Sequence, residues 1–101
     1  MLNNTGLIPV AQATIHSIDN GEVRLEYSLR SITGPEGEAH YGLRVDKYRP
    51  SGELIESADS LPFTGSLKRA ATLAEVFAAG TVTPCVLQEM VMEWHEDILV
   101  A

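Results

Sequence analysis

The stretch Gly80-Thr81-Val82-Thr83-Pro84-Cys85-Val86-Leu87 lies between two segments of helical periodicity, and the rest of the fold is organised around it. Gly80 follows the apolar residues 76–79, and we predict that it ends a helix by adopting the left-handed conformation. Thr83 can cap a second helix, and Pro84 suits the first turn of that helix. The C-terminal third is therefore predicted to be a helical hairpin that covers the apolar face of a sheet.

The periodicity of apolar residues places the first helix at residues 67–79, with Ser66 as its N-cap. In the second helix, apolar residues recur at steps of three or four: Leu87, Met90, Val91, Trp94 and Ile98. The opposite side of this helix carries Glu89, Glu93, Glu96 and Asp97. Since no Lys or Arg follows Arg69, the hairpin is predicted to present an acidic surface.

The N-terminal part of the chain has the alternating pattern of antiparallel strands. Residues 13–18 and 22–30 flank Asp19-Asn20-Gly21, and residues 40–48 and 53–59 flank Arg49-Pro50-Ser51-Gly52. Residues 1–10 show no period, and the first few are predicted to be mobile. The sequence therefore predicts an α+β fold, in which an antiparallel sheet of about four strands is covered on one face by the helical hairpin.

The turn at Asp19-Asn20-Gly21 also predicts a register for the first two strands. A three-residue loop with Gly21 in a left-handed bulge position sets Ile15 opposite Leu25 and Ala13 opposite Tyr27. A two-residue turn would place Ile15 opposite Glu26, on the polar face. We therefore expect the three-residue loop, which leaves Ile18 facing outward.

Length and charge exclude several classes of function. A chain of 101 residues is expected to form one domain, residues 1–101. The net charge of −7 argues against nucleic acid and anionic membranes, which bind proteins through Lys and Arg. A DNA-reading helix-turn-helix is excluded because the second helix has no basic residue. No apolar run is long enough to cross a bilayer, and we expect a cytoplasmic protein.

Cys85 is the only cysteine and the sharpest catalytic candidate. A thiolate in the first turn of a helix is stabilised by free backbone N–H groups, which would make it a nucleophile. His16, His40 and His95 lie in three different elements, and no motif links them to Cys85. The simpler interpretation is that Cys85 is a small apolar residue under the sheet.

No pattern indicates a metal or a cofactor. His95-Glu96-Asp97 lies near Glu89 and Glu93, but a zinc motif needs a second histidine on this helix. Gly34-Pro35-Glu36-Gly37 lacks the Gly-Lys-Ser/Thr of a phosphate loop and precedes a strand. We read these segments as a solvated acidic face and a turn.

Two hypotheses of different classes remain open. The first is a non-enzymatic interaction or regulatory module that binds a protein partner through a strand edge or through the acidic helices, at Glu89, Met92, Glu93 and Glu96. The second is a small thiol-dependent enzyme or redox sensor that uses Cys85. We also expect self-association as a homodimer, with strand 22–30 permitting Glu–Arg pairs between two subunits.

Three structural segments resemble those of a known family: Tyr41-Gly42-Leu43-Arg44-Val45, then Gly52-Glu53-Leu54, and Val82-Thr83-Pro84 leading to Val91 and Glu93. In these segments the chain resembles a domain of unknown function found in short uncharacterised proteins of Firmicutes, many from gut clostridia. The resemblance covers about residues 13–97. It implies a small bacterial cytoplasmic protein and supplies no catalytic residue.

Overall fold

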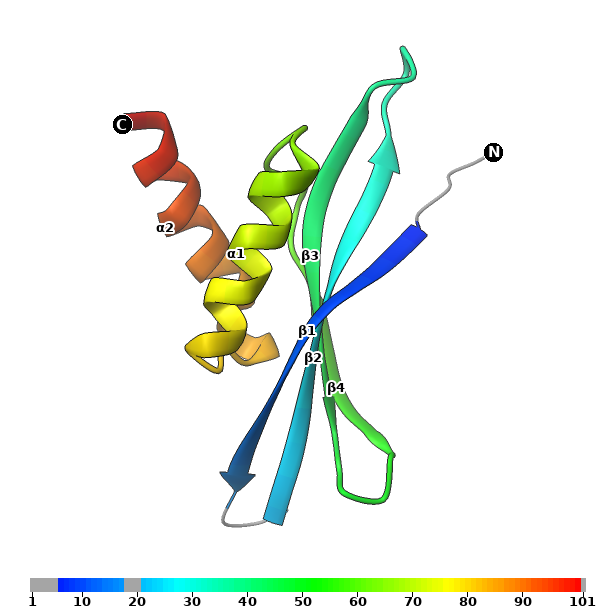
Figure 1. Ribbon diagram of the computed structural model, residues 1–101, viewed down its shortest axis with the longest axis vertical. Coiled ribbons are helices and arrows are strands. Elements are labelled where there is room, and N and C mark those ends of the chain that lie inside the picture. The colour runs from blue at the N-terminus through cyan, green and yellow to red at the C-terminus, as the bar shows by residue number, and fades with distance from the viewer. Residues whose placement is uncertain (1–5, 18–20, 101) are drawn as a thin grey trace.

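The computed structural model describes residues 6–17 and 21–100 (Figure 1). Four antiparallel strands form one sheet in the order β1-β2-β3-β4. They are β1 (Gly6–Ser17), β2 (Gly21–Thr33), β3 (Ala39–Tyr48) and β4 (Leu54–Asp59). The helices α1 (Leu67–Ala79) and α2 (Leu87–Val100) follow, with a 3-10 turn, η1 (Pro84–Val86), between them. The predicted α+β fold is confirmed.

The core lies between one face of the sheet and helix α1, which packs on β1, β2 and β3. Strand β2 alternates as predicted and buries Val23, Leu25, Tyr27 and Leu29, of which the last three belong to the core cluster with α1. Small residues of α1 allow a close approach, because Ala70 and Ala74 are fully buried beside Phe77. The Tyr27 hydroxyl donates to the carbonyl oxygen of Val82 at 2.7 Å. This bond ties the middle of the sheet to the segment that joins the helices.

Strand β1 is longer than the sequence predicted. It begins at Gly6, whereas the sequence pattern placed the start of the first strand at residue 13. Leu7 pairs with Arg30, and Ile8 pairs with Leu29. The long strand β2 supplies backbone partners that the local pattern of residues 6–10 does not reveal. Residues 1–5, where mobility was expected, lie outside the described part of the chain.

The register of the first hairpin differs from the predicted one by two residues. Ile15 lies opposite Val23, and Ala13 lies opposite Leu25. A shift of two residues keeps every side chain on its predicted face, so burial of the apolar residues cannot distinguish the two registers. Gly21 has the expected positive φ of 72°. Ile18, predicted to face outward, lies outside the described residues.

Helix α1 has the predicted bounds and the predicted cap, since Ser66 Oγ accepts from the backbone N–H of Arg69 at 3.2 Å. Its C-terminus differs from the prediction. Gly80 has φ −91°, and the left-handed residue is Thr81, with φ 51°. Two backbone bonds close the helix, from Thr81 N–H to the Ala78 carbonyl (3.1 Å) and from Val82 N–H to the Phe77 carbonyl (3.0 Å). This is the Schellman pattern, with Thr81 where glycine is usual.

Candidate functional site

The exposed edge at β1 is the first candidate site. Strand β1 lies at one end of the strand order and has twelve residues, GLIPVAQATIHS, none of them charged. Leu7 is 50% exposed and Ile8 is 41% exposed. An edge strand presents unpaired backbone N–H and C=O groups, and proteins usually protect such edges with charge, proline, bulges or a covering segment.

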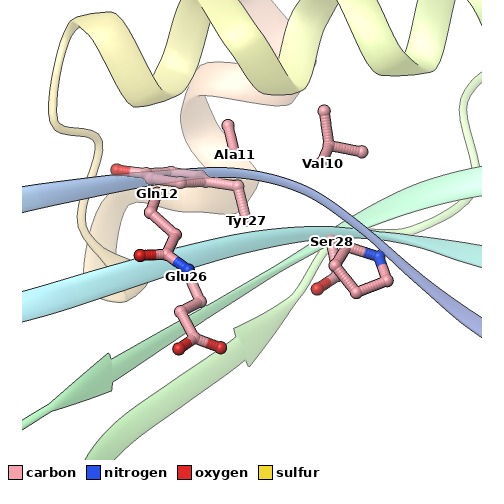
Figure 2. A pocket seen from close by; sticks show the side chains of 7 residues that line it. Val10, Ala11, Gln12, Glu26, Tyr27 and Ser28 are labelled. Carbon is pink, nitrogen blue, oxygen red and sulfur yellow. The ribbon is translucent and has the colours of Figure 1, made fainter.

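A bulge divides this edge into two parts. The register of β1 against β2 shifts between Pro9 and Ala11, so Val10 is the extra residue. Figure 2 shows the side chains of Val10 and Ala11 both on the helix side of the strand, while Gln12 points to the other side. Pro9 also lacks an N–H group. The bulge and the proline therefore interrupt the edge, and residues 11–17 run on in regular register.

A hollow of about 290 Å³ lies at the bulge, lined by residues of β1 and β2 (Figure 2). Among these residues, Glu26 has the only charged side chain, and its carboxylate pairs with Arg24 at 2.8 Å. Burial raises the pKa of Tyr27 to about 12, so this phenol stays protonated at neutral pH and keeps its bond to Val82. The lining residues thus offer no paired groups for acid–base catalysis.

The opposite edge of the sheet is protected. Strand β4 has only six residues and carries Glu56 and Asp59. Beyond β4, Ser60 continues along β3: its N–H donates to the Leu43 carbonyl at 2.8 Å, and its Oγ accepts from the Leu43 N–H at 2.9 Å. A bridge between Tyr41 and Thr64 extends this cover. The two edges therefore differ: among the described residues, the part of the β1 edge that carries no charge, proline or bulge is residues 11–17.

The face of the sheet opposite α1 carries a network of ion pairs. Arg44 contacts Asp46 at 3.1 Å and Asp59 at 3.2 Å, and Arg30 lies 3.8 Å from Asp59. Asp46 is only 8% exposed and also accepts from Ser57 Oγ at 2.7 Å. Burial alone would lower the pKa of the Arg44 guanidinium, but the two carboxylates raise it overall. Because these charged side chains pair with one another, we interpret this face of the sheet as stabilising the fold rather than binding a ligand.

The same topology corrects the expected dimer contact. Residues 22–30 belong to β2, which lies inside the sheet between β1 and β3. Arg24 pairs with Glu26 of its own strand and stacks over the Tyr48 ring at 4.9 Å. Strand β2 therefore cannot supply an intersubunit strand pair, and the predicted role of its Glu and Arg residues is wrong.

Cys85 lies in the 3-10 turn η1, one turn before α2, and its side chain is exposed. The interpretation that it is buried under the sheet is therefore wrong. Its sulfur lies 3.4 Å from Thr83 Oγ1. Within the described part of the chain, no three His, Cys, Asp or Glu side chains gather as a metal site would need. His16 lies on β1 and His40 on β3, and His40 contacts Glu38, whereas the polar contact found for Cys85 among the described residues is with Thr83.

The structure describes the side chains of part of the predicted acidic surface on α2. Glu89, Met92 and Glu93 are exposed on α2, and Met92 is 55% exposed. The side chain of Glu96 and the segment His95-Glu96-Asp97 lie beyond the side chains that the structure describes. Among the described residues, no helix has the length and apolar content needed to cross a bilayer.

A family model described as a family of unknown function (DUF6514) matches residues 7–97. The chain belongs to this family. The match begins in β1 and ends in α2, so DUF6514 includes both the edge strand and the helical layer. No curated protein and no solved structure matches the chain. Membership of DUF6514 confirms the resemblance to a domain of unknown function; an origin in Firmicutes stays a prediction.

The sequence analysis expected a strand edge as one possible interaction site, but it did not identify that edge as β1. The signal was available in composition, since residues 6–17 include no Asp, Glu, Lys or Arg in a chain with 21 charged residues, 7 basic and 14 acidic. The lack of charge in residues 6–17 indicates a site only when the strand order is known, because that order places β1 at an edge of the sheet.

Proposed function

We propose that the protein is a non-enzymatic interaction module, acting in the cytoplasm, whose binding element is the β1 edge and whose partner is a second copy of the chain. One observation carries this proposal: β1 is an edge strand of twelve residues without a charge. Backbone hydrogen bonds to an added strand would satisfy the free N–H and C=O groups of this edge.

The register of such a pair follows from symmetry. In one continuous sheet, two antiparallel copies of β1 are related by a two-fold axis, so paired residues must lie on the same face. Centring the axis at Thr14 pairs the whole of residues 11–17 and sets Ala13 opposite the partner's Ile15. Gln12 then faces the partner's His16 on the open face. The small residues Ala11 and Ser17 lie opposite each other at the ends of the paired segment, and the bulge at Val10 ends the ladder.

Charge gives this proposal a distinctive salt dependence. Each copy carries a net charge of −7, so two copies repel each other in dilute buffer. Salt screens that repulsion but leaves backbone pairing intact, so association should strengthen as salt is added. Binding of a basic partner to the acidic face of α2 would instead weaken with salt.

Sedimentation of the protein at micromolar concentration tests the proposal. We expect a species of twice the 11.0 kDa chain mass. Thr14→Glu should sediment as a monomer, because two carboxylates would meet at the axis. Within one copy this carboxylate lies opposite Arg24, so the fold tolerates it. Thr33→Glu, at another exposed strand position, is the matched control and should remain dimeric.

A charge-swap experiment completes the test. Thr14→Lys should also be monomeric alone, whereas an equimolar mixture with Thr14→Glu should form a heterodimer. A wild-type protein that stays at 11.0 kDa on concentration would overturn the proposal. A dimer that survives Thr14→Glu would overturn it as well.

A further inference from the structure

A second hollow, of about 380 Å³, lies between the first turns of α1 and the middle of α2. Its volume falls within the range of small-molecule sites, roughly 300–1,000 Å³. Both helices stand on the same side of the sheet (Figure 1), so the hollow is on the face away from the ion-pair network and does not involve the β1 edge. It is therefore independent of the proposed dimer contact.

Three apolar side chains from three separate elements line the hollow, together with the polar residues Ser66, Lys68, Arg69 and Thr72. Phe63 comes from the segment after β4, Leu73 from α1 and Trp94 from α2. Leu73 is buried, whereas both aromatic side chains are only partly buried. Two aromatic rings and a leucine in one hollow offer a surface on which a flat apolar group can pack.

Two cations line the same hollow. Lys68 and Arg69 are exposed, and they are the only Lys or Arg residues after Arg49. Arg24, Arg30, Arg44 and Arg49 each pair with a carboxylate. No carboxylate whose side chain the structure describes forms such a pair with Lys68 or Arg69. In a chain of net charge −7, the hollow thus concentrates positive charge beside aromatic walls.

We propose that this hollow binds a small aromatic carboxylate, with its ring against Phe63 and Trp94 and its anionic group at Lys68 and Arg69. Lys and Arg at the rim would attract the anion and orient it, and the apolar walls would supply most of the affinity. A neutral ligand of the same shape should bind more weakly because it lacks the charged contact.

Trp94 makes the test specific, because it is the only tryptophan and gives a single indole N–H signal in a nitrogen–proton NMR spectrum. The probe is 4-phenylbutyrate, and the matched neutral probe is 4-phenylbutanol. We expect saturable movement of the indole signal by the carboxylate, with the alcohol binding about five- to tenfold more weakly, as two exposed charge contacts would give.

Two double variants distinguish an effect of the charges at the hollow from an effect of the protein's net charge on binding. Lys68→Gln with Arg69→Gln should abolish the preference for the carboxylate over the alcohol. Lys47→Gln with Arg49→Gln removes the same two residue types from the β3–β4 hairpin and should preserve that preference.

Three results would overturn the proposal: no saturable shift of the indole signal, equal affinity for the two probes, or an unchanged preference in the Lys68/Arg69 variant. Tighter binding of an oligoglutamate peptide to the same signal would also overturn it, and would assign the hollow to an acidic protein segment.

Discussion

At the C-terminus of α1, the structure and the sequence pattern predict opposite effects of the same substitutions on protein stability. The pattern assigned the left-handed residue to Gly80, whereas the structure gives Gly80 φ −91° and Thr81 φ 51°. We predict that Thr81→Gly stabilises the protein. A left-handed conformation costs a residue with a side chain about 1–2 kcal/mol, and a β-branched residue such as threonine is among the least suited to it.

The expected gain in stability from Thr81→Gly is smaller than the backbone strain that the substitution removes. Glycine also makes the unfolded chain more flexible, and this offsets roughly 0.4–1 kcal/mol of the gain from removing the strain. The bond from Thr81 Oγ1 to the Gly80 carbonyl (2.7 Å) is also lost, but it is exposed and local. We therefore expect a net gain of about 0.5–1 kcal/mol in the free energy of unfolding for Thr81→Gly. In a chain of this size that is a rise in Tm of about 2–6 °C.

Gly80→Ala is the companion variant, and it decides between the two assignments. An added Cβ would stand 3.7 Å from the Val76 carbonyl oxygen and 3.9 Å from that of Phe77, which are ordinary contacts. Since φ is negative, alanine should stabilise the protein by about 0.4–1 kcal/mol. Urea unfolding at one fixed protein concentration measures both variants. If both Gly80→Ala and Thr81→Gly destabilised the protein, Gly80 would be the left-handed residue and the structural assignment would be wrong.

Three further predictions concern bonds that hold the helical layer in place. Tyr27→Phe should lower the free energy of unfolding by about 1–2 kcal/mol, because the Val82 carbonyl loses its buried donor; an unchanged urea midpoint would contradict this role. Burial raises the pKa of Tyr27 to about 12 from about 10, so the unfolded state loses the proton first and stability should fall between pH 10 and 12, by about 2–3 kcal/mol in total. Urea midpoints measured across that range check this, and Tyr27→Phe should have the shallower slope. Ser66→Ala should cost about 1 kcal/mol by removing the cap on the Arg69 N–H, as thermal unfolding can measure, whereas Ser51→Ala, in an exposed turn, should change little.

Local sequence patterns correctly predicted the strands and helices that are determined by residues close together in the chain. The alternation of residues 22–30 identified β2, and Ser66 with the apolar stripe identified α1. The end of α1 was predicted less well, because the left-handed residue depends on where Val82 must go after the helix. In the structure, Val82 returns to bond Phe77 and accepts from Tyr27, and this places the reversal one residue after Gly80.

Features that depend on long-range pairing could not be read from local patterns. Registers two residues apart bury the same face of β1, so the choice of Ala13 opposite Leu25 needs the whole ladder. Likewise, the absence of charge in residues 6–17 acquires meaning only when β1 is known to be an edge. The hollow at Phe63 and Trp94 joins residues that are far apart in the chain, and periodicity indicated only that Trp94 faces inward.

Amide hydrogen exchange in residues 11–17, measured by NMR as a function of protein concentration, tests the central claim most directly. About half of the backbone N–H groups in an edge strand point away from its neighbour, and in a monomer these exchange quickly. The account predicts that they become protected as concentration rises, with the same midpoint as dimer formation, and that Thr14→Glu keeps them in fast exchange. Fast exchange at every concentration in a protein that nevertheless dimerises would show that the β1 edge is not the contact.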